Sequence, residues 1–389
     1  MHEPDDDEGA SVTSNEELRR ALRDVSGDFS ESSTLPPACY TGAGVLAAEM
    51  SGLLPQSWVG VARADEWEEP GDYRVLDVAG TSMIVLRDET GRLRVFANTC
   101  RHRGTRLMDG SGNAKRIRCP FHGWTYGLDG SLRGATRMGA AREFRHADMG
   151  LVEFRAAERG GFVFVATSGE TPGIDDWLGG FDALHAPWQL EELVTTRRRE
   201  LEVDCNWKLF LEVFNESYHL EYVHAATFGD IYLEPKGPDE AGACVHSSFS
   251  PTAGTGGLKA DEQDHVLPAM PGLSARERSG TRYTWVFPAL TFAAGSEALW
   301  AYGAQPLGPR RCRVTQWVCF PPRTVASPGF EAKAGRYYAR MDEALAEDIA
   351  MLERQQLGMD SPFARAGRWS DLERGPAAFA AWYAKRLAP

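Results

Sequence analysis

The sequence lacks several features, and each absence argues against a class of protein. No stretch of about 18 consecutive residues is apolar, which argues against a membrane-spanning helix. Positive charge is scarce, because 42 Lys and Arg against 55 Asp and Glu leave a net charge of −13, so the basic field that attracts nucleic acid or an anionic membrane is missing. The opening MHEPDDDEG is acidic where a secretory signal has basic residues followed by an apolar run. We therefore expect a cytoplasmic protein that binds neither nucleic acid nor membrane.

A disulfide framework is also unexpected. The chain has seven cysteines, an odd number, and no secretory signal, which favours reduced thiols. With 389 residues, 43% of them hydrophobic, the chain is long enough for two or three domains that each bury a core.

The pattern along the chain divides it into an acidic segment and two larger units. Residues 1–45 are acidic and then rich in Ser, Thr and Pro, and we expect them to be flexible apart from a short helix at 15–25. From about residue 58 to 168, short β runs alternate with turn residues, as at Tyr73–Val78, Met83–Arg87, Leu93–Ala97 and Gly161–Ala166. This part predicts a small antiparallel β sandwich.

After Pro172 the elements become longer. The pattern predicts a helix near Trp207–His224, strands within 281–320 and a long helix at about 336–358. The fold class expected for the chain is therefore α+β: an N-terminal β domain followed by an antiparallel sheet flanked by helices.

Two short segments of the β unit combine cysteine with histidine. They are Cys100-Arg-His102 and Cys119-Pro-Phe-His122, spaced C-x-H-x16-C-x2-H, and each follows a strand-like run that places it at a loop tip. Two thiolates and two imidazoles that converge from such loops provide four metal ligands.

The identity of that metal site has alternatives. One is a structural zinc site, and another is a pair of buried cysteines beside surface histidines. The usual Cys2His2 zinc finger pairs Cys with Cys and His with His, whereas here each segment supplies one of each. The alternation favours a 2Fe–2S cluster with both histidines on one iron, and Gly104 and Gly123 would allow the backbone to approach its sulfides.

A second group of candidate ligands lies in the predicted helix near Trp207–His224. Glu216 falls on the apolar, inward face, and His219 is its neighbour three residues on. His219 and His224 are five residues apart, or about 140° around an ideal helix, so we expect a bulge or bent turn to bring both to one ion. Ordinary surface or packing roles for these residues remain the alternative.

The long helix near the end of the chain offers a carboxylate. Asp348 lies between Leu345 and Leu352 on the predicted buried face, whereas Glu347 and Glu353 fall toward the solvent side. An unpaired buried carboxylate is costly, so Asp348 should face a cation. Two histidines and one carboxylate form the ligand set of non-haem Fe(II) oxygenases.

The cysteine–histidine segments resemble the Rieske cluster signature, which implies that Cys100 and Cys119 bind one iron while His102 and His122 bind the other. Over about residues 45–385 the chain is similar to the catalytic (alpha) subunits of Rieske non-haem iron oxygenases, the ring-hydroxylating dioxygenases and related monooxygenases. The resemblance implies a Rieske 2Fe–2S domain at 46–180 and a catalytic domain at 181–389.

The same resemblance implies further roles and partners. His219, His224 and Asp348 would bind a mononuclear Fe(II), and Glu216 would be the bridging carboxylate that links His219 to the Rieske histidine His122 of a neighbouring subunit. This arrangement implies a head-to-tail homotrimer. It also implies electrons that come from NAD(P)H through a reductase, with or without a ferredoxin, and activation of O2 for a small organic substrate.

The type of oxygenation follows from two departures from the family pattern. Glu216 replaces the more common Asp, as in the monooxygenase branches that include enzymes of quaternary ammonium compounds, and Val213 stands where ring dioxygenases often have Asn. Both favour hydroxylation or oxidative demethylation, with cis-dihydroxylation of an aromatic ring as the alternative.

Two other classes of protein compete with the oxygenase hypothesis. A Rieske-type electron carrier would not need the roughly 200 residues after the β domain, and in a zinc-stabilised ligand-binding protein Asp348 would have no purpose. For an oxygenase, we expect a substrate pocket that suits either arenes or methylammonium groups, near Phe210, Phe214, Leu290, Phe292 and Trp300. An ordinary core position is the alternative for each of these five residues, and the more frequent one.

Overall fold

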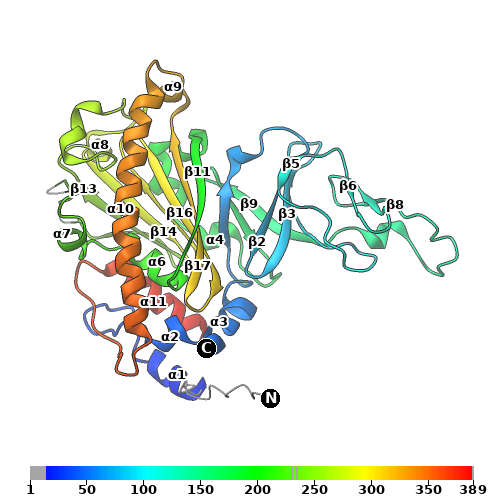
Figure 1. Ribbon diagram of the computed structural model, residues 1–389, viewed down its shortest axis with the longest axis horizontal. Helices are drawn as coiled ribbons and strands as arrows, with labels where there is room; N and C mark the ends of the chain where they lie inside the picture. Colours follow the sequence, from blue (N-terminus) through cyan, green and yellow to red (C-terminus); the bar gives the residue numbers. More distant parts are fainter. Residues whose placement is uncertain (1–14, 229–230, 234, 388–389) are drawn as a thin grey trace, which may run out of the picture.

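The computed structural model describes residues 15–228, 231–233 and 235–387, and these form two units side by side (Figure 1). A β-rich unit occupies one end of the molecule, and a larger unit of sheet and helices occupies the other. Within the described ranges, no helix combines the length and the apolar character needed to cross a membrane.

The β-rich unit is built from two antiparallel sheets. The larger sheet has the order β1-β10-β9-β4-β3-β2-β5, made of β1 (Val59–Arg63), β2 (Asp72–Val78), β3 (Thr81–Arg87), β4 (Leu93–Ala97), β5 (Ser111–Asn113), β9 (Glu153–Arg159) and β10 (Phe162–Ala166). A three-stranded sheet at its far end contains β6 (Ile117–Arg118), β7 (Thr125–Tyr126) and β8 (Leu132–Gly134). The predicted strands are confirmed, because alternating β-branched and turn residues signal short strands locally.

The larger unit contains a second seven-stranded antiparallel sheet. Its order is β11-β17-β16-β15-β14-β13-β12, made of β11 (Val194–Val203), β12 (Pro238–Gly242), β13 (Val245–Pro251), β14 (Gly280–Val286), β15 (Leu290–Ala294), β16 (Leu299–Gly308) and β17 (Arg311–Phe320). The long helix α10 (Phe330–Met359) crosses one face of this sheet together with α6 (Trp207–Phe214) and α11 (Arg374–Leu387) (Figure 1). The predicted α+β class is confirmed.

Shorter helices complete the chain. They are α1 (Asn15–Leu22), α2 (Ala38–Thr41), α3 (Ala43–Ala48), the π-helical turn η1 (Glu49–Leu53), α4 (Ile174–Leu178), α5 (Phe181–His185), α7 (Leu220–Val223), α8 (Ala275–Arg278) and α9 (Pro322–Val325). The short segments of 3-10 helix among the described residues are η2 (Ala64–Glu66), η3 (His146–Met149), η4 (Ala186–Trp188), η5 (Leu190–Glu192) and η6 (Ala260–His265).

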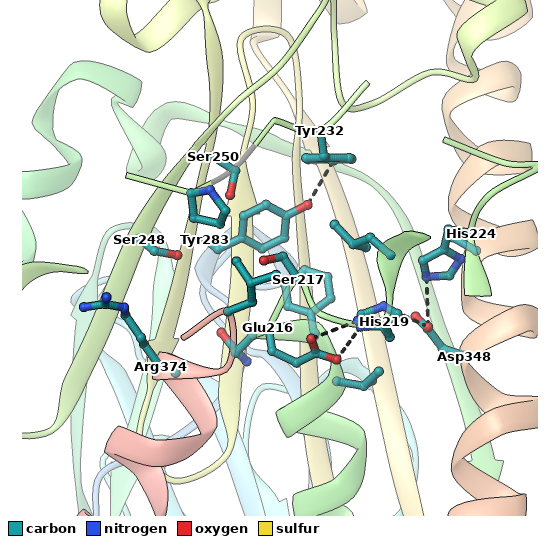
Figure 2. A pocket seen from close by; sticks show the side chains of 18 of the residues that line it. Glu216, Ser217, His219, His224, Tyr232, Ser248, Ser250, Tyr283, Asp348 and Arg374 are labelled. Carbon is teal, nitrogen blue, oxygen red and sulfur yellow. Dashed lines mark hydrogen bonds and ion pairs between the residues drawn. The ribbon is translucent and has the colours of Figure 1, made fainter. Parts of the chain in front are cut away.

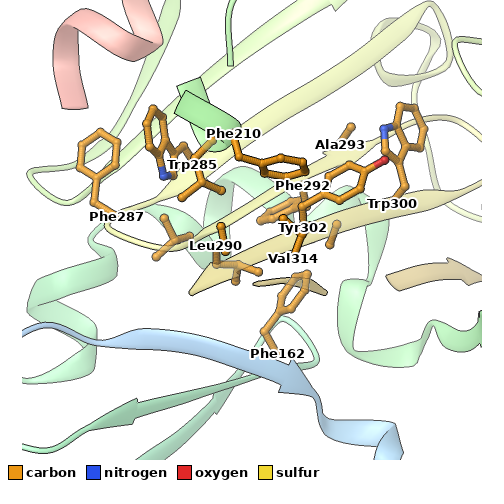
Figure 3. Close-up of a cluster of buried hydrophobic side chains, with 14 of the residues drawn as sticks. Phe162, Phe210, Trp285, Phe287, Leu290, Phe292, Ala293, Trp300, Tyr302 and Val314 are labelled. Carbon is orange, nitrogen blue, oxygen red and sulfur yellow. The ribbon is translucent and has the colours of Figure 1, made fainter. Parts of the chain in front are cut away.

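The two units share one hydrophobic core (Figure 3). Phe162 of β10 packs with its ring centroid 5.2 Å from that of Phe292 on β15. At the neighbouring strand β1, a Cβ on Gly60 would come within 2.6 Å of the Leu290 side chain, so glycine is required where the strands approach. Apolar contact of this kind holds the β-rich unit firmly against the sheet.

The N-terminal segment is more ordered than expected. Residues 1–14 lie outside the described residues, but Leu18, Leu22, Leu35 and Tyr40 are buried in the main core. The predicted short helix at 15–25 is confirmed by α1. The flexibility predicted for the residues that follow, up to residue 45, is wrong, because their apolar side chains pack on a surface of the larger unit that composition alone does not reveal.

Candidate metal centres and pocket

The four candidate cluster ligands lie at the end of the β-rich unit. Cys100 and His102 follow β4, while Cys119 and His122 lie in the turn between β6 and β7. Both cysteines are buried, whereas His102 is partly exposed and His122 is exposed. The two imidazole centroids are 4.8 Å apart. The structure therefore places two histidines on the outside and two cysteines behind them.

Both loops make the same turn. The N–H of Gly104 donates to the Cys100 carbonyl at 3.0 Å, and the N–H of Gly123 donates to the Cys119 carbonyl at 3.1 Å. Both glycines have φ of +72°, a left-handed conformation that other residues rarely adopt. The repeated turn explains why each segment presents its cysteine and histidine in the same way.

The surroundings of these residues fit a cluster. Burial opposes ionisation of Cys119, yet the N–H groups of Phe121 and His122 donate to its sulfur and hold the pKa of the thiol below its ordinary value. Tyr126 Oη lies 3.4 Å from Cys100 Sγ, as expected for a hydroxyl that supports a thiolate. Within the described chain, the buried Nδ1 of His102 has no hydrogen-bond partner, so it is available to a metal.

The second group of candidate ligands forms where the chain breaks between two helices. The sequence predicted one bent helix near Trp207–His224, but α6 ends at Phe214 and α7 begins at Leu220. Glu216 causes the restart, because its Oε2 accepts the backbone N–H groups of Tyr218 and His219. The break brings the ring centroids of His219 and His224 to 5.0 Å from each other.

Asp348 of α10 completes this group (Figure 2). One potential ligand atom from each of His219, His224 and Asp348 lies within 4.8 Å of the other two. The Nε2 atoms of His224 and His219 are 3.0 Å and 3.6 Å from Asp348 Oδ1. Three elements far apart in the sequence thus converge on one small volume.

The outer nitrogen of each histidine is held by a glutamate. His219 Nδ1 donates to Glu216, and His224 Nδ1 donates to Glu347 Oε2 at 2.6 Å. A carboxylate only accepts, so both Nδ1 atoms carry a proton, and in the neutral form of each ring the Nε2 lone pair faces Asp348 Oδ1. That buried oxygen has no hydrogen-bond donor among the described residues. Three electron-rich atoms in such contact require a cation, and the donor set suits Fe(II).

Glu347 corrects the sequence analysis, which placed it on the solvent side of α10. Its Oε1 also accepts from Thr227 Oγ1 at 2.6 Å, so the carboxylate bridges α10 to the segment after α7. No spacing rule connects Glu347 with His224, because they are 123 residues apart. The sequence therefore offered no signal for this contact.

A cavity opens beside the His219, His224 and Asp348 group. It encloses about 1160 Å³ of empty space, counted out to its mouth, and its walls are rich in aromatic side chains: Phe210, Phe214, Phe228, Tyr232, Tyr283, Trp300 and Tyr302. The prediction that Phe210, Phe214 and Trp300 line the pocket is confirmed. Leu290 and Phe292 do not line it, because they lie on the opposite face of β15 and pack against the β-rich unit.

Comparison with known protein families accounts for most of the chain. Residues 57–145 match the family described as "Rieske [2Fe-2S] domain". Residues 190–389 match the family described as "Ring hydroxylating alpha subunit (catalytic domain)". These matches confirm the resemblance drawn from the sequence.

Individual relatives give the same picture. The chain is 28% identical to choline monooxygenase of Arabidopsis thaliana over 88% of its own length and 80% of that protein. It is 34% identical to the carnitine monooxygenase oxygenase subunit of Acinetobacter baumannii over 49% of its own length, and this match spans about half (52%) of that protein.

Two solved structures share the fold. A quaternary ammonium Rieske monooxygenase superposes with a TM-score of 0.76 at 24% identity, with 95% of this chain and 98% of that chain covered. Naphthalene 1,2-dioxygenase from Rhodococcus sp. superposes with a TM-score of 0.79 at 22% identity, with 97% and 99% covered.

Proposed function

We propose a substrate class and a reaction for this chain, which belongs to the family of ring-hydroxylating alpha subunits. As a member with a Rieske domain, it is an oxygenase with a 2Fe–2S cluster and a mononuclear non-haem iron, and it uses O2 and electrons from a reductase. The proposal concerns which residues bind these groups and what is oxidised.

The ligand assignment rests on the geometry of the two centres. Cys100, Cys119, His102 and His122 hold the cluster, and His219, His224 and Asp348 hold the mononuclear iron. When bound, the cluster supplies single electrons and the mononuclear iron provides open positions for O2. Glu216 and Glu347 keep the Nε2 lone pairs of the histidines directed at the metal position, and the pocket walls exclude water from it.

The proposed reaction is monooxygenation of a methylammonium compound. The observation that carries this proposal is the concentration of aromatic rings around a cavity next to the metal position, because their faces attract a cationic methylammonium group. The names of the choline and carnitine relatives support the same class. One oxygen atom of O2 enters a C–H bond next to the nitrogen, and two electrons and two protons convert the other to water. A hydroxylated N-methyl group then separates as formaldehyde and leaves the demethylated amine.

Cis-dihydroxylation of an arene is the second candidate. The same aromatic walls accept a flat ring, and the naphthalene dioxygenase shares the fold. The two candidates differ in their products, since dihydroxylation puts both oxygen atoms into the substrate and releases no formaldehyde.

The assembly is also part of the proposal. We place the boundary between the Rieske and catalytic domains near residue 180, with a homotrimer in which Glu216 contacts His122 of the next subunit and electrons arrive with or without a ferredoxin. The exposed position of His122 is compatible with such a contact. A cytoplasmic location stays a prediction.

Protein purified without oxygen provides the test. We expect about three irons and two acid-labile sulfides per chain, and formaldehyde release from carnitine, glycine betaine or choline with a reductase and NADH. Glu216→Gln should keep both metals but nearly abolish electron transfer between them in rapid mixing. A diol from naphthalene with no formaldehyde from any ammonium compound would replace the monooxygenase proposal. Zinc without sulfide would refute the metal assignment.

A further inference from the structure

Arg340 is a buried cation with few partners, and it lies in the wall of the pocket. It comes from the middle of α10, and only 4% of its surface is exposed. Its Nη2 donates to Tyr232 Oη at 3.2 Å, while its Nε is buried with no acceptor among the described residues. No carboxylate of the described chain lies within ion-pair distance of its guanidinium.

The other two buried arginines of the described residues also have an Nε without an acceptor, but each has an anionic partner that Arg340 lacks among these residues. Arg63 donates to the carbonyls of Gly160 and Leu190 and lies 3.7 Å from Asp65. Arg282 pairs with Asp239 at 2.6 Å. Burial of a guanidinium without an anion or carbonyl partner is costly, so the absence of such a partner for Arg340 among the described residues requires a reason.

Aromatic contacts compensate for only part of this cost. The Arg340 guanidinium lies 4.1 Å from the Phe228 ring centroid and 5.5 Å from that of Trp300. These contacts fix its direction but accept none of its N–H groups. The hydroxyl of Tyr232 accepts a second hydrogen bond, from Tyr283 at 2.9 Å (Figure 2), so the one oxygen that Arg340 reaches is already shared.

The position of Arg340 relative to the metal group gives the pocket two chemically different ends. Arg340, Ala344 and Asp348 follow one another at steps of four residues, and all three line the cavity. Eight residues of α-helix separate the first and the last by about 12 Å along the axis. The cavity wall therefore contains the metal position and, about two helical turns away along α10, a guanidinium without an anionic partner among the described residues.

We infer that Arg340 binds an anionic group of the substrate, and that a carboxylate is that group. Building on the proposed function, the substrate is then an elongated zwitterion with a methylammonium end near His219, His224 and Asp348 and a carboxylate end at Arg340. A guanidinium matches a carboxylate in shape, and a desolvated pair inside an aromatic cavity gains more than one in water. The protein should therefore bind an ammonium compound that carries a carboxylate more tightly than an ammonium alcohol such as choline.

Calorimetric binding to the anaerobic, metal-loaded protein tests this inference without turnover. The probes are γ-butyrobetaine and its methyl ester, which keep the same chain and ammonium group but differ in the anion. The wild-type protein should bind the acid more tightly than the ester. Arg340→Gln should weaken binding of the acid roughly 10- to 100-fold and leave binding of the ester nearly unchanged.

Arg336→Gln is the matched control. Arg336 precedes Arg340 by one turn of the same helix and pairs with Glu262 at 2.8 Å instead of lining the pocket. The Arg336→Gln variant also removes one positive charge from α10, but it should still bind the acid more tightly than the ester. Arg374 also lines the cavity, so Arg374→Gln is a second control and should keep the preference for the acid. If Arg340→Gln folds poorly, Arg340→Lys replaces it, and because a lysine lacks the planar fork of the guanidinium, this variant should still bind the acid more weakly than the wild type does.

A second pair of probes, 4-phenylbutanoate and its methyl ester, separates this inference from the proposed function. If only the phenyl acid binds, and does so through Arg340, the carboxylate site stands and the methylammonium proposal fails. If choline binds as tightly as γ-butyrobetaine, or if neither acid is preferred over its ester, the inference about Arg340 is wrong.

Discussion

Glu347 Oε2 lies 2.6 Å from His224 Nδ1, and this contact mirrors the one between Glu216 and His219. Each of the two candidate histidine ligands is thus oriented by a glutamate that binds its Nδ1, the ring nitrogen that faces away from Asp348. The two glutamates come from different elements, α10 and the break after α6. The pairing fixes the tautomer of both rings before any metal arrives.

Replacement of Glu347 should therefore weaken metal binding. In Glu347→Ala, His224 loses the acceptor for its Nδ1–H and the ring can rotate or change tautomer, so the affinity for the mononuclear metal should fall roughly 10- to 100-fold. Iron retained after dialysis against a chelator measures this effect. Glu353→Ala on the same helix is the control, and equal iron retention in the two variants would contradict the role of Glu347.

Asp348→Ala should remove the mononuclear iron and leave the cluster intact. Without this carboxylate the two Nε2 lone pairs lack the third ligand of the set. The iron content should fall from about three to about two per chain, turnover should stop, and the visible spectrum of the cluster should persist. Loss of the cluster absorbance, or unchanged turnover, would remove Asp348 from the metal site.

Sequence reasoning succeeded where ligands are close in the chain and failed where contacts are remote. Cys100 and His102 are two residues apart, so their shared loop follows from local pattern alone. Glu347 meets His224 only after a separation of 123 residues, and the angle of a helix face cannot specify which neighbour covers it.

The failure at β15 has a similar cause. An apolar strand buried on both faces has no alternation that distinguishes the pocket face from the other, so Leu290 and Phe292 were assigned to the wrong side. For the same reason, the sequence wrongly predicted flexibility for residues 26–45, because their buried contacts lie with residues far along the chain.

Tyr126→Phe should lower the reduction potential of the cluster. The Tyr126 hydroxyl lies 3.4 Å from Cys100 Sγ and accepts the N–H of Arg101 at 3.1 Å. A hydrogen bond to a cluster thiolate favours the reduced, more negative state, so its loss should shift the potential down by about 20–60 mV. Voltammetry of the purified protein measures the shift. An unchanged potential with intact iron and sulfide would show that this hydroxyl does not support the thiolate.

Glu49→Gln should destabilise the whole protein. Glu49 Oε1 lies 2.6 Å from Lys208 Nζ, both side chains are fully buried, and Trp207 and Tyr383 also donate to the carboxylate. Removal of one charge leaves the other buried without a partner, at a cost of about 3–5 kcal/mol in unfolding free energy. Urea unfolding should show this loss. The double variant Glu49→Leu with Lys208→Met should recover only part of it, because no unpaired charge remains but Trp207 and Tyr383 lose their acceptor. No recovery at all would assign the loss to packing.

His185 should make the stability depend on pH. Its Nδ1 donates to the Phe181 carbonyl at 2.7 Å, so its Nε2 accepts from Thr284 Oγ1, also at 2.7 Å, and the ring is neutral. Burial lowers the pKa of His185 to about 3. The positive charge of Arg282 also lowers this pKa, whereas the hydrogen bond to the Phe181 carbonyl raises it. The imidazole takes up a proton near pH 6.5 in the unfolded chain but only near pH 3 in the folded protein. The contribution of neutral His185 to the unfolding free energy is therefore complete above pH 6.5 and is lost as the pH falls toward 3.

His185→Gln isolates this contribution. The variant should be less stable than the wild type at pH 7.5, because the buried imidazole and its two hydrogen bonds are lost, but the difference should shrink by up to about 1.4 kcal/mol per pH unit below pH 6. Urea unfolding at several pH values measures the difference. His146→Gln, which changes an exposed histidine, should follow the wild-type curve. A difference between His185→Gln and the wild type that stays constant with pH would mean that folding does not lower the pKa of His185.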